Sequence, residues 1–259
     1  MSFIKVKLNT PSKEVKSLET MLLDHGAISV TLENNSSKNI LEPAVGEQPL
    51  WDNIQLSALF KEDDFKKNII EDIKTNIDQS VCNYEIEKLI EQDWERKCLD
   101  EYSPIYFGGD LWVCPSWRNP PNKSAVNLIL DPGLAFGTGM HATTALCLEW
   151  LAKKELKDIT MIDYGCGSGI LAIAAALLGA KRVICVDNDP QALTATKKNV
   201  KKNKVNETQF SYFSPQEYQE FIKKDTQTIN LIMANILANP LIELAPKFKR
   251  TLSDGGYLI

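Results

Sequence analysis

The N-terminal part of the chain alternates between strand-like and helix-like hydrophobic periods. Apolar and polar residues alternate over 3–9, which predicts a strand, and apolar residues recur at helical spacing over 12–26, which predicts a helix ending at Gly26. Further strands are predicted over 27–34, 54–60 and 83–90, and a second amphipathic helix over 63–77. The order β-α-β-β-α-β is that of a ferredoxin-like split-βαβ unit, a small α+β domain that is usually a binding module.

The C-terminal part alternates helices with continuous apolar runs. The run 159–164 predicts a central parallel strand, and the almost wholly apolar 170–179 predicts a buried helix. Strands over 182–187, 208–213 and 229–235 follow, each separated from the next by a helix-type segment. The predicted fold class is therefore α/β, with a Rossmann-like doubly wound sheet after the small α+β domain. A new strand begins where the sequence stops, so we expect the final strands of this sheet to be missing.

Three segments follow from these patterns. Residues 1–92 form the predicted α+β domain, 93–125 an aromatic-rich linker and connector, and 126–259 the predicted doubly wound domain. The composition, 44% hydrophobic and 24% charged, is that of an ordinary globular chain, and no apolar run approaches the roughly 20 residues of a membrane span. With no signal-peptide pattern and six cysteines but no CxxC pair, we expect a cytoplasmic protein with reduced thiols.

The charge is unevenly distributed along the chain. Residues 1–95 carry 10 Lys and Arg against 18 Asp and Glu, whereas the remainder has a net charge of +3. An acidic first domain disfavours a nucleic-acid backbone as its partner and suits a basic one, although a solvated acidic surface explains the charge equally well. The chain has only two histidines, His25 and His141, far apart in sequence, so no metal site is expected.

The glycine motif MIDYGCGSGILAI, residues 161–173, is the strongest local signal. A strand ends, glycines follow at 165, 167 and 169, and a helix begins; Asp187 ends the next strand, where its carboxylate can accept both hydroxyls of a ribose. This context predicts a nucleoside-containing ligand held by Gly165, Gly167 and Asp187. The fingerprint of nicotinamide dinucleotide binding needs a third glycine where Ile170 stands. The acidic Asp163 would also be a poor neighbour for the pyrophosphate of such a dinucleotide. A structural role for Asp163, capping N–H groups of the loop, is compatible with a dinucleotide and with a ligand that has no pyrophosphate.

Asn235 ends the fourth strand of the predicted sheet, within LIMANILANP. Asparagine is poor in strands and common in turns, so a turn is the simple explanation. Ligands of this fold bind outside the carboxyl ends of the strands, however, which places Asn235 at the expected site. Many amino-group methyltransferases have [DNS]-P-P-[FYW] here. N-I-L-A lacks the aromatic residue that would stack on a nucleobase and leaves an amide oxygen for an aliphatic amine.

Four motifs in order, DPGLAFGTGMHATT, DYGCGSGIL, VDNDP and ANILANPL, follow the split-βαβ segment and closely resemble those of the PrmA family of ribosomal protein methyltransferases. GxGxG after an acidic residue resembles motif I of class I methyltransferases, whose cofactor is S-adenosylmethionine. The resemblance implies methylation of lysine ε-amino and N-terminal α-amino groups, to the trimethyl state, on the eleventh protein of the large ribosomal subunit, at the stalk base. It also implies that the N-terminal domain recognises this protein substrate.

By position, the resemblance assigns cofactor contacts to residues quoted from these motifs. They are Thr144, Gly165, Gly167, Asp187 and Asn235, with Phe136 and Gly137 in a mobile loop over the cofactor. Asn235 is also the expected catalytic residue, because it would position the amine. His141 is the candidate general base, although it fits a helix start as well, and desolvation of the amine would serve without any base.

Two other classes of function stay open on the sequence. One is a class I methyltransferase acting on RNA, DNA or a small-molecule amine, and the other is a non-catalytic cofactor-binding module. The acidic first domain and the missing Pro-Pro-aromatic run argue against a nucleobase substrate. We expect a monomer without membrane association or direct nucleic-acid specificity.

Overall fold

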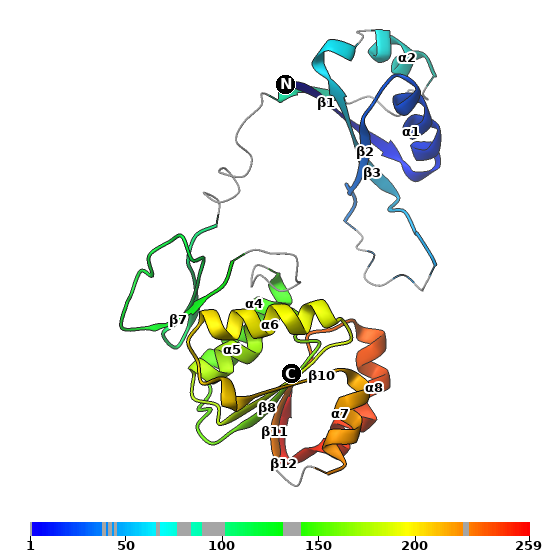
Figure 1. The fold of residues 1–259 in the computed structure, drawn as a ribbon. Helices are drawn as coiled ribbons and strands as arrows, with labels where there is room; N and C mark the ends of the chain where they lie inside the picture. Colours follow the sequence, from blue (N-terminus) through cyan, green and yellow to red (C-terminus); the bar gives the residue numbers. More distant parts are fainter. Residues whose placement is uncertain are drawn as a thin grey trace. The chain divides into compact units, whose positions relative to one another are not determined.

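The computed structural model describes residues 2–37, 40, 43, 46–65, 68–76, 84–89, 102–131, 141–224 and 228–259 (Figure 1). The chain divides into two compact units, Met1–Leu99 and Asp100–Ile259. Each unit is described by itself.

The first unit is a four-stranded antiparallel sheet with helices on one face. Its strands are β1 (Phe3–Pro11), β2 (Ser29–Asn34), β3 (Asn53–Lys61) and β4 (Tyr84–Leu89), in the order β2-β3-β1-β4. Its helices are α1 (Val15–Asp24) and α2 (Asn68–Asn76), which follow 3-10 turns at Ser12–Glu14 and Glu62–Asp64. The chain order and the strand order are those of the predicted split-βαβ unit.

Alternation along the strands explains this unit. Every second residue of β1, including Val6 and Leu8, is fully or almost fully buried and packs with Leu18 and Leu22 of α1. Gly26 has φ +91°, the left-handed conformation that ends a helix and favours glycine, as the sequence predicts.

The second unit begins with a small three-stranded sheet. Strands β5 (Ile105–Gly108) and β6 (Leu111–Cys114) form a hairpin, and β6 pairs in parallel with β7 (Val126–Ile129). Two of these strands lie in the range 93–125, for which the sequence predicts an aromatic-rich linker and connector. In the structure they belong to the same compact unit as the large sheet.

The large sheet is parallel, with the order β10-β9-β8-β11-β12. Its strands are β8 (Thr160–Tyr164), β9 (Arg182–Val186), β10 (Phe210–Phe213), β11 (Ile229–Met233) and β12 (Leu252–Leu258). Its helices are α4 (Ala142–Ala152), α5 (Ile170–Leu177), α6 (Pro190–Lys202), α7 (Pro215–Ile222) and α8 (Ala238–Thr251). This is the Rossmann-like α/β fold that the sequence predicts.

Two hydrophobic cores lie on opposite faces of this sheet. Met161 of β8 packs with residues of α4, α5 and α6, whereas its neighbour Ile162 packs with Tyr218 of α7 and Phe248 of α8. Helices α5 and α6 cover one face of the sheet, and α7 and α8 cover the other (Figure 1). Side chains cap two of these helices: Asp189 accepts from the Gln191 N–H at the start of α6, and Ser214 forms a capping box with Glu217 at α7.

The start of α8 differs from its prediction. The sequence suggests that Asn239–Pro240 opens this helix, but α8 begins at Ala238 with Leu237 as the residue preceding it. The four cysteines in the described ranges, Cys114, Cys147, Cys166 and Cys185, are buried free thiols. Within those ranges no helix combines the length and the apolar character that a membrane crossing requires.

Candidate active site

The glycine motif forms a tight loop between β8 and α5. Gly165, Gly167 and Gly169 have φ values of +79°, +53° and +80°, which other residues adopt only with strain. A methyl group on Gly165 would also lie 2.3 Å from Ile236 Cγ2, and one on Gly169 would lie 2.6 Å from Thr196 Cγ2. The backbone conformation therefore favours glycine at all three positions, and the side chains of Ile236 and Thr196 pack where a Cβ atom would stand at Gly165 and Gly169.

Asp187 follows β9 and lies directly beside this loop. Its Oδ2 accepts from Gly167 N at 2.9 Å, and its Oδ1 accepts from Asp189 N at 2.9 Å. The residue is 8% exposed. Each carboxylate oxygen has a further lone pair, so Asp187 is placed to accept the hydroxyls of a ribose while holding the loop. The structure thus brings together two residues that the sequence predicts as neighbours.

Asp163 lies beneath the loop and is almost wholly buried. Its Oδ2 accepts from Ala172 N in the first turn of α5 at 3.0 Å, so it satisfies a helix N–H group rather than those of the glycine loop. Burial, the largest effect, raises the pKa of Asp163 to about 7; the Ala172 bond lowers it and the charge of Asp187 raises it. A carboxyl group already occupies this helix N-terminus, where a dinucleotide pyrophosphate would otherwise bind.

The raised pKa of Asp163 predicts a pH-dependent stability. Because the folded state binds the proton more tightly than the unfolded state, this group's contribution is fully present below about pH 4 and is lost as the pH rises to about 7. Asp163→Asn keeps an acceptor for Ala172 N–H and carries no charge. We expect the variant to be more stable than the parent by about 1–4 kcal/mol at pH 8. Thermal unfolding from pH 4 to pH 8 should show this gap closing as the pH falls, and a gap independent of pH would contradict the assignment.

Asn235 and Thr144 meet at the carboxyl edge of the sheet. Asn235 comes two residues after β11, the fourth strand of the large sheet in chain order, and its Nδ2 donates to Thr144 Oγ1 of α4 at 2.9 Å. Thr144 is 3% exposed, whereas Asn235 is half-buried. With the amide nitrogen engaged, the amide oxygen is left to accept, and no donor to it occurs among the described residues. The structure therefore joins two predicted site residues 91 positions apart.

His141 is the N-cap residue of α4. Its Nδ1 accepts from Thr143 N at 3.4 Å and lies 2.7 Å from Thr143 Oγ1, and its side chain is exposed. This geometry matches the helix-start role that the sequence leaves open for His141. The predicted site residues Phe136 and Gly137 lie outside the described residues.

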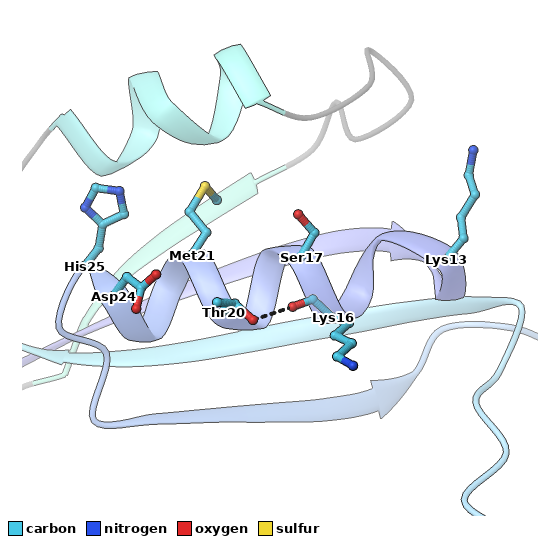
Figure 2. A pocket seen from close by; sticks show the side chains of 7 residues that line it. All are labelled: Lys13, Lys16, Ser17, Thr20, Met21, Asp24 and His25. Carbon is cyan, nitrogen blue, oxygen red and sulfur yellow. Dashed lines mark hydrogen bonds between the residues drawn. The ribbon is translucent and has the colours of Figure 1, made fainter.

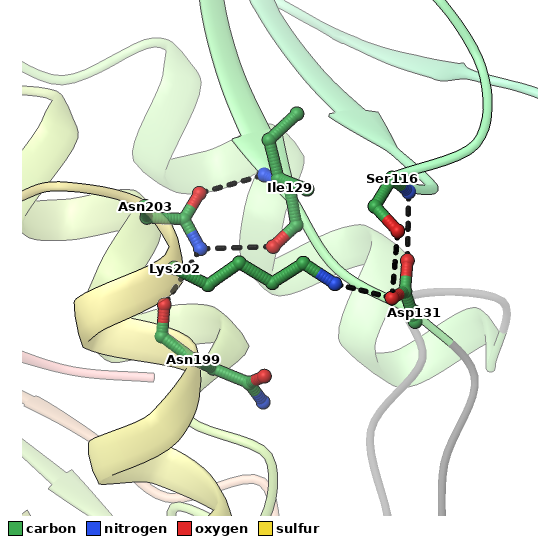
Figure 3. A network of polar contacts seen from close by, with 6 residues as sticks. All are labelled: Ser116, Ile129, Asp131, Asn199, Lys202 and Asn203. Carbon is green, nitrogen blue, oxygen red and sulfur yellow. Dashed lines mark hydrogen bonds and ion pairs between the residues drawn. The ribbon is translucent and has the colours of Figure 1, made fainter.

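Helix α6 connects the glycine loop to β7, a role that sequence reasoning missed. Thr196 Oγ1 donates to Gly167 O at 2.9 Å, and Asn199 Nδ2 donates to Ser168 O at 2.8 Å. At the end of the helix, the Asn203 amide bonds both the N–H and the carbonyl of Ile129, at 2.6 and 2.8 Å (Figure 3). In the sequence, Thr196, Asn199 and Asn203 look like any polar face of a helix. Only their spacing of three and four residues indicates that they lie on the same side of α6.

Asp131 extends this network beyond β7. It accepts from the backbone N and the hydroxyl of Ser116, at 2.7 and 2.9 Å, and from Lys202 of α6 (Figure 3). Although partial burial alone raises the pKa of Asp131, the bonds from Lys202 and Ser116 lower it below its usual value. One helix thus fixes the glycine loop and the end of β7 relative to each other.

The first unit has a hollow of about 600 Å³ along one face of α1 (Figure 2). Its lining residues are Lys13, Lys16, Ser17, Thr20, Met21, Asp24 and His25. His25 Nε2 lies 3.2 Å from Asp72 Oδ2 of α2, so the hollow borders on the second helix. Two lysines, one aspartate and His25 make most of this lining charged or polar.

Comparisons with known proteins agree on one family. A family model described as "Ribosomal protein L11 methyltransferase (PrmA)" matches residues 2–259. A protein named ribosomal protein L11 methyltransferase from Saccharophagus degradans is 41% identical over 99% of this chain and 86% of its own length. One of the same name from Shewanella sp. (strain ANA-3) is 45% identical over the whole chain and 86% of its own length.

A solved structure of a ribosomal protein L11 methylase is also similar to this chain. The ribosomal protein L11 methylase from Lactobacillus delbrueckii subsp. bulgaricus is 34% identical, with a TM-score of 0.52 over 61% of this chain and 78% of that protein.

Proposed function

The chain belongs to the ribosomal protein L11 methyltransferase (PrmA) family, and from this premise we propose that it transfers methyl groups from S-adenosylmethionine to amino groups of ribosomal protein L11. The observation that carries the chemistry is the Asn235–Thr144 pair at the same sheet edge as the glycine loop and Asp187. We assign cofactor contacts to Thr144, Gly165, Gly167, Asp187 and Asn235.

The residues at this edge fit S-adenosylmethionine, which supplies an electrophilic methyl group on a sulfonium centre. The glycine loop turns tightly at the carboxyl edge of the sheet, and the Asp187 carboxylate beside it provides acceptors for the ribose. The buried carboxyl of Asp163 occupies the start of α5, which suits a cationic ligand and opposes a pyrophosphate. Phe136 and Gly137 lie outside the described residues. By their motif, we assign them to a loop that lies over the cofactor.

The targets in this proposal are lysine ε-amino groups and the N-terminal α-amino group. The amide oxygen of Asn235 accepts from an amine N–H and aims the nitrogen lone pair along the line of attack. A nucleobase would need a stacking surface, and the residue three positions after Asn235 is Ala238 rather than an aromatic. The site therefore favours an aliphatic amine.

The amine must lose a proton before it attacks, because the ordinary pKa of a lysine ammonium is about 10.4. Transfer of the amine from water into the half-buried site beside Asn235 disfavours its charged form and lowers its pKa. His141 is bonded to its own helix turn through Nδ1, so we assign it the helix cap first. Proton loss to solvent followed by positioning accounts for the reaction without a dedicated base.

We assign recognition of the protein substrate to the first unit. Residues 1–95 carry 18 Asp and Glu against 10 Lys and Arg, so this part of the chain is strongly acidic. Ribosomal proteins bind RNA and are commonly basic, so an acidic surface attracts such a substrate. In this proposal the substrate is L11, the ribosomal protein of the stalk base. The enzyme acts on it in the cytoplasm as a monomer.

Replacing Asp187 by alanine should weaken cofactor binding about 10- to 100-fold, because a hydrogen bond to a charged acceptor contributes about 1.5–3 kcal/mol. Calorimetric titration with S-adenosylmethionine measures the change. Asp189→Ala is the matched control, since Asp189 caps α6 through Gln191 and should lower the melting temperature without a comparable loss of affinity. Equal affinities in the parent and the Asp187→Ala variant would reduce Asp187 to a structural residue.

The proposed function is tested by offering several substrates together. The enzyme is incubated with S-adenosylmethionine labelled in its methyl group, ribosomal protein L11, other ribosomal proteins and ribosomal RNA. Label on L11, released as methylated lysine and methylated N-terminal residue, is the expected result. Label confined to RNA would instead favour a nucleic-acid methyltransferase, and no label in any fraction would favour a non-catalytic cofactor-binding module.

A further inference from the structure

Thr196 is the polar member of the buried stripe of α6. Ala192 and Val200, about one helical turn before and after it, are buried and apolar, and Thr196 itself is fully buried. A buried hydroxyl needs a hydrogen-bond partner, and a threonine within a helix often finds one in the carbonyl four residues earlier. Thr196 instead donates to the glycine loop, to Gly167 O at 2.9 Å. The hydroxyl of this helix residue therefore acts on the loop.

The methyl and hydroxyl groups of Thr196 contact different parts of the loop. A Cβ atom at Gly169 would lie 2.6 Å from Thr196 Cγ2, so the methyl group packs against this glycine. The hydroxyl hydrogen is engaged by Gly167 O, so the Cys166 thiol, whose Sγ lies 3.4 Å from Thr196 Oγ1, is the donor in that contact. The methyl group thus contributes packing, and the hydroxyl group fixes the backbone of the loop.

Gly167 is held on both sides of its Cα atom. Its carbonyl accepts from Thr196 Oγ1, and its N–H donates to Asp187 Oδ2 at 2.9 Å. These two groups belong to successive peptide planes, so the two bonds together fix φ and ψ of a residue that has no Cβ atom to restrict them and whose φ is +53°. Loss of the Thr196 bond frees ψ and loosens the backbone that donates to Asp187.

We propose that Thr196 is a positioning residue for the cofactor: through Gly167, it holds the Asp187 carboxylate in the direction that the ribose hydroxyls require. This inference rests on the proposed function, in which Asp187 accepts from the ribose. Because Thr196 is fully buried, it acts through these two residues without touching the cofactor. Its hydroxyl orders the acceptor before the cofactor arrives, so loss of the hydroxyl weakens binding.

Four side chains at position 196 separate the hydroxyl group from the methyl group. Threonine and valine have a similar shape and differ in the hydroxyl, serine and alanine also differ in the hydroxyl, and threonine differs from serine in the methyl. We expect the Kd of S-adenosylmethionine to rise about tenfold from the parent to Thr196→Val and from Thr196→Ser to Thr196→Ala. Thr196→Ser should bind within about twofold of the parent although it melts at a lower temperature, because it loses only packing.

Thr194 is the matched control, since it is an exposed threonine of the same helix. Its hydroxyl donates to the carbonyl of Pro190, four residues earlier in α6, at 2.8 Å. Thr194→Val removes a hydroxyl that does not bond the loop, so its Kd should stay within about twofold of the parent. All variants are titrated as full-length protein by calorimetry, at a temperature at which circular dichroism shows them to be folded.

A double substitution tests the route through Asp187. If Thr196 acts on binding by holding this carboxylate, its hydroxyl has nothing left to position once the carboxylate is removed. In an Asp187→Ala background, Thr196→Val should therefore raise the Kd by less than about twofold. Two independent contributions to binding would instead multiply.

Any of four results would overturn the inference. They are a parental Kd in Thr196→Val, an equal loss of affinity in Thr196→Ser, an equal loss in Thr194→Val, and an undiminished effect of Thr196→Val in the Asp187→Ala background. If Thr196→Val does not fold, the comparison of Thr196→Ala with Thr196→Ser decides, since these two variants differ in the hydroxyl alone. A parent that does not bind S-adenosylmethionine refutes the proposed function itself.

Discussion

Replacing Asn235 by alanine is expected to lower the single-turnover rate of methyl transfer by about 100-fold while changing the melting temperature little. The amide oxygen is the acceptor that holds the amine nitrogen in line with the methyl group, and its loss removes orientation from the bound complex. The stability cost is small because the side chain is half-buried and its one hydrogen bond among the described residues is to Thr144, at 2.9 Å. Rapid-mixing measurements with enzyme in excess over L11, beside thermal unfolding, separate the two quantities.

Asn230 provides the control for this experiment, because it lies at the opposite end of the same strand. Its Oδ1 accepts from Thr160 N at 2.9 Å, so Asn230→Ala removes a bond between strands far from the carboxyl edge. This variant should melt at a lower temperature and transfer methyl groups at the parental rate once folded. If Asn235→Ala behaves like Asn230→Ala, destabilised yet catalytically normal, Asn235 is an ordinary turn residue.

Deleting residues 1–99 should abolish methylation of L11 and spare cofactor binding. The first unit has its own hydrophobic core, which includes Val6, Leu18 and Phe60. The residues assigned to the cofactor all lie in the second unit. We expect its affinity for S-adenosylmethionine to stay within about threefold and the rate on L11 to fall by at least about 100-fold, because recognition energy is lost.

Circular dichroism and calorimetry are the controls for the deletion, since they show that the remaining unit is folded and binds its cofactor. Under those conditions, a rate on L11 equal to that of the full chain would mean that the first unit does not recognise the substrate.

Hydrophobic period was sufficient to predict most of the fold. The run 159–164 is apolar because β8 is buried on both faces between two cores, and the apolar segment 170–179 became the buried helix α5. The position of Asn235 after the fourth strand followed from the same pattern. Element starts were less predictable. The sequence suggests that Asn239–Pro240 opens α8, but the helix begins at Ala238, with Leu237 before it.

The site was predictable only where residues lie in one motif or in consecutive strands. Gly167 and Asp187 meet because adjacent parallel strands end at the same edge. The contact between Asn235 and Thr144 joins segments distant in sequence; the family resemblance assigned each residue to the cofactor but did not predict that the two contact each other. The bonds from Thr196 and Asn199 to the loop carbonyls depend on how α6 packs, which period alone does not specify.

The mass of intact ribosomal protein L11, measured after incubation with this enzyme and S-adenosylmethionine, tests the central claim most directly. The account predicts that the mass rises in whole methyl increments, and that fragmentation places them on lysine side chains and the N-terminal amine, as many as three on each nitrogen. An L11 mass that does not change, with enzyme from the same preparation binding S-adenosylmethionine, would contradict it.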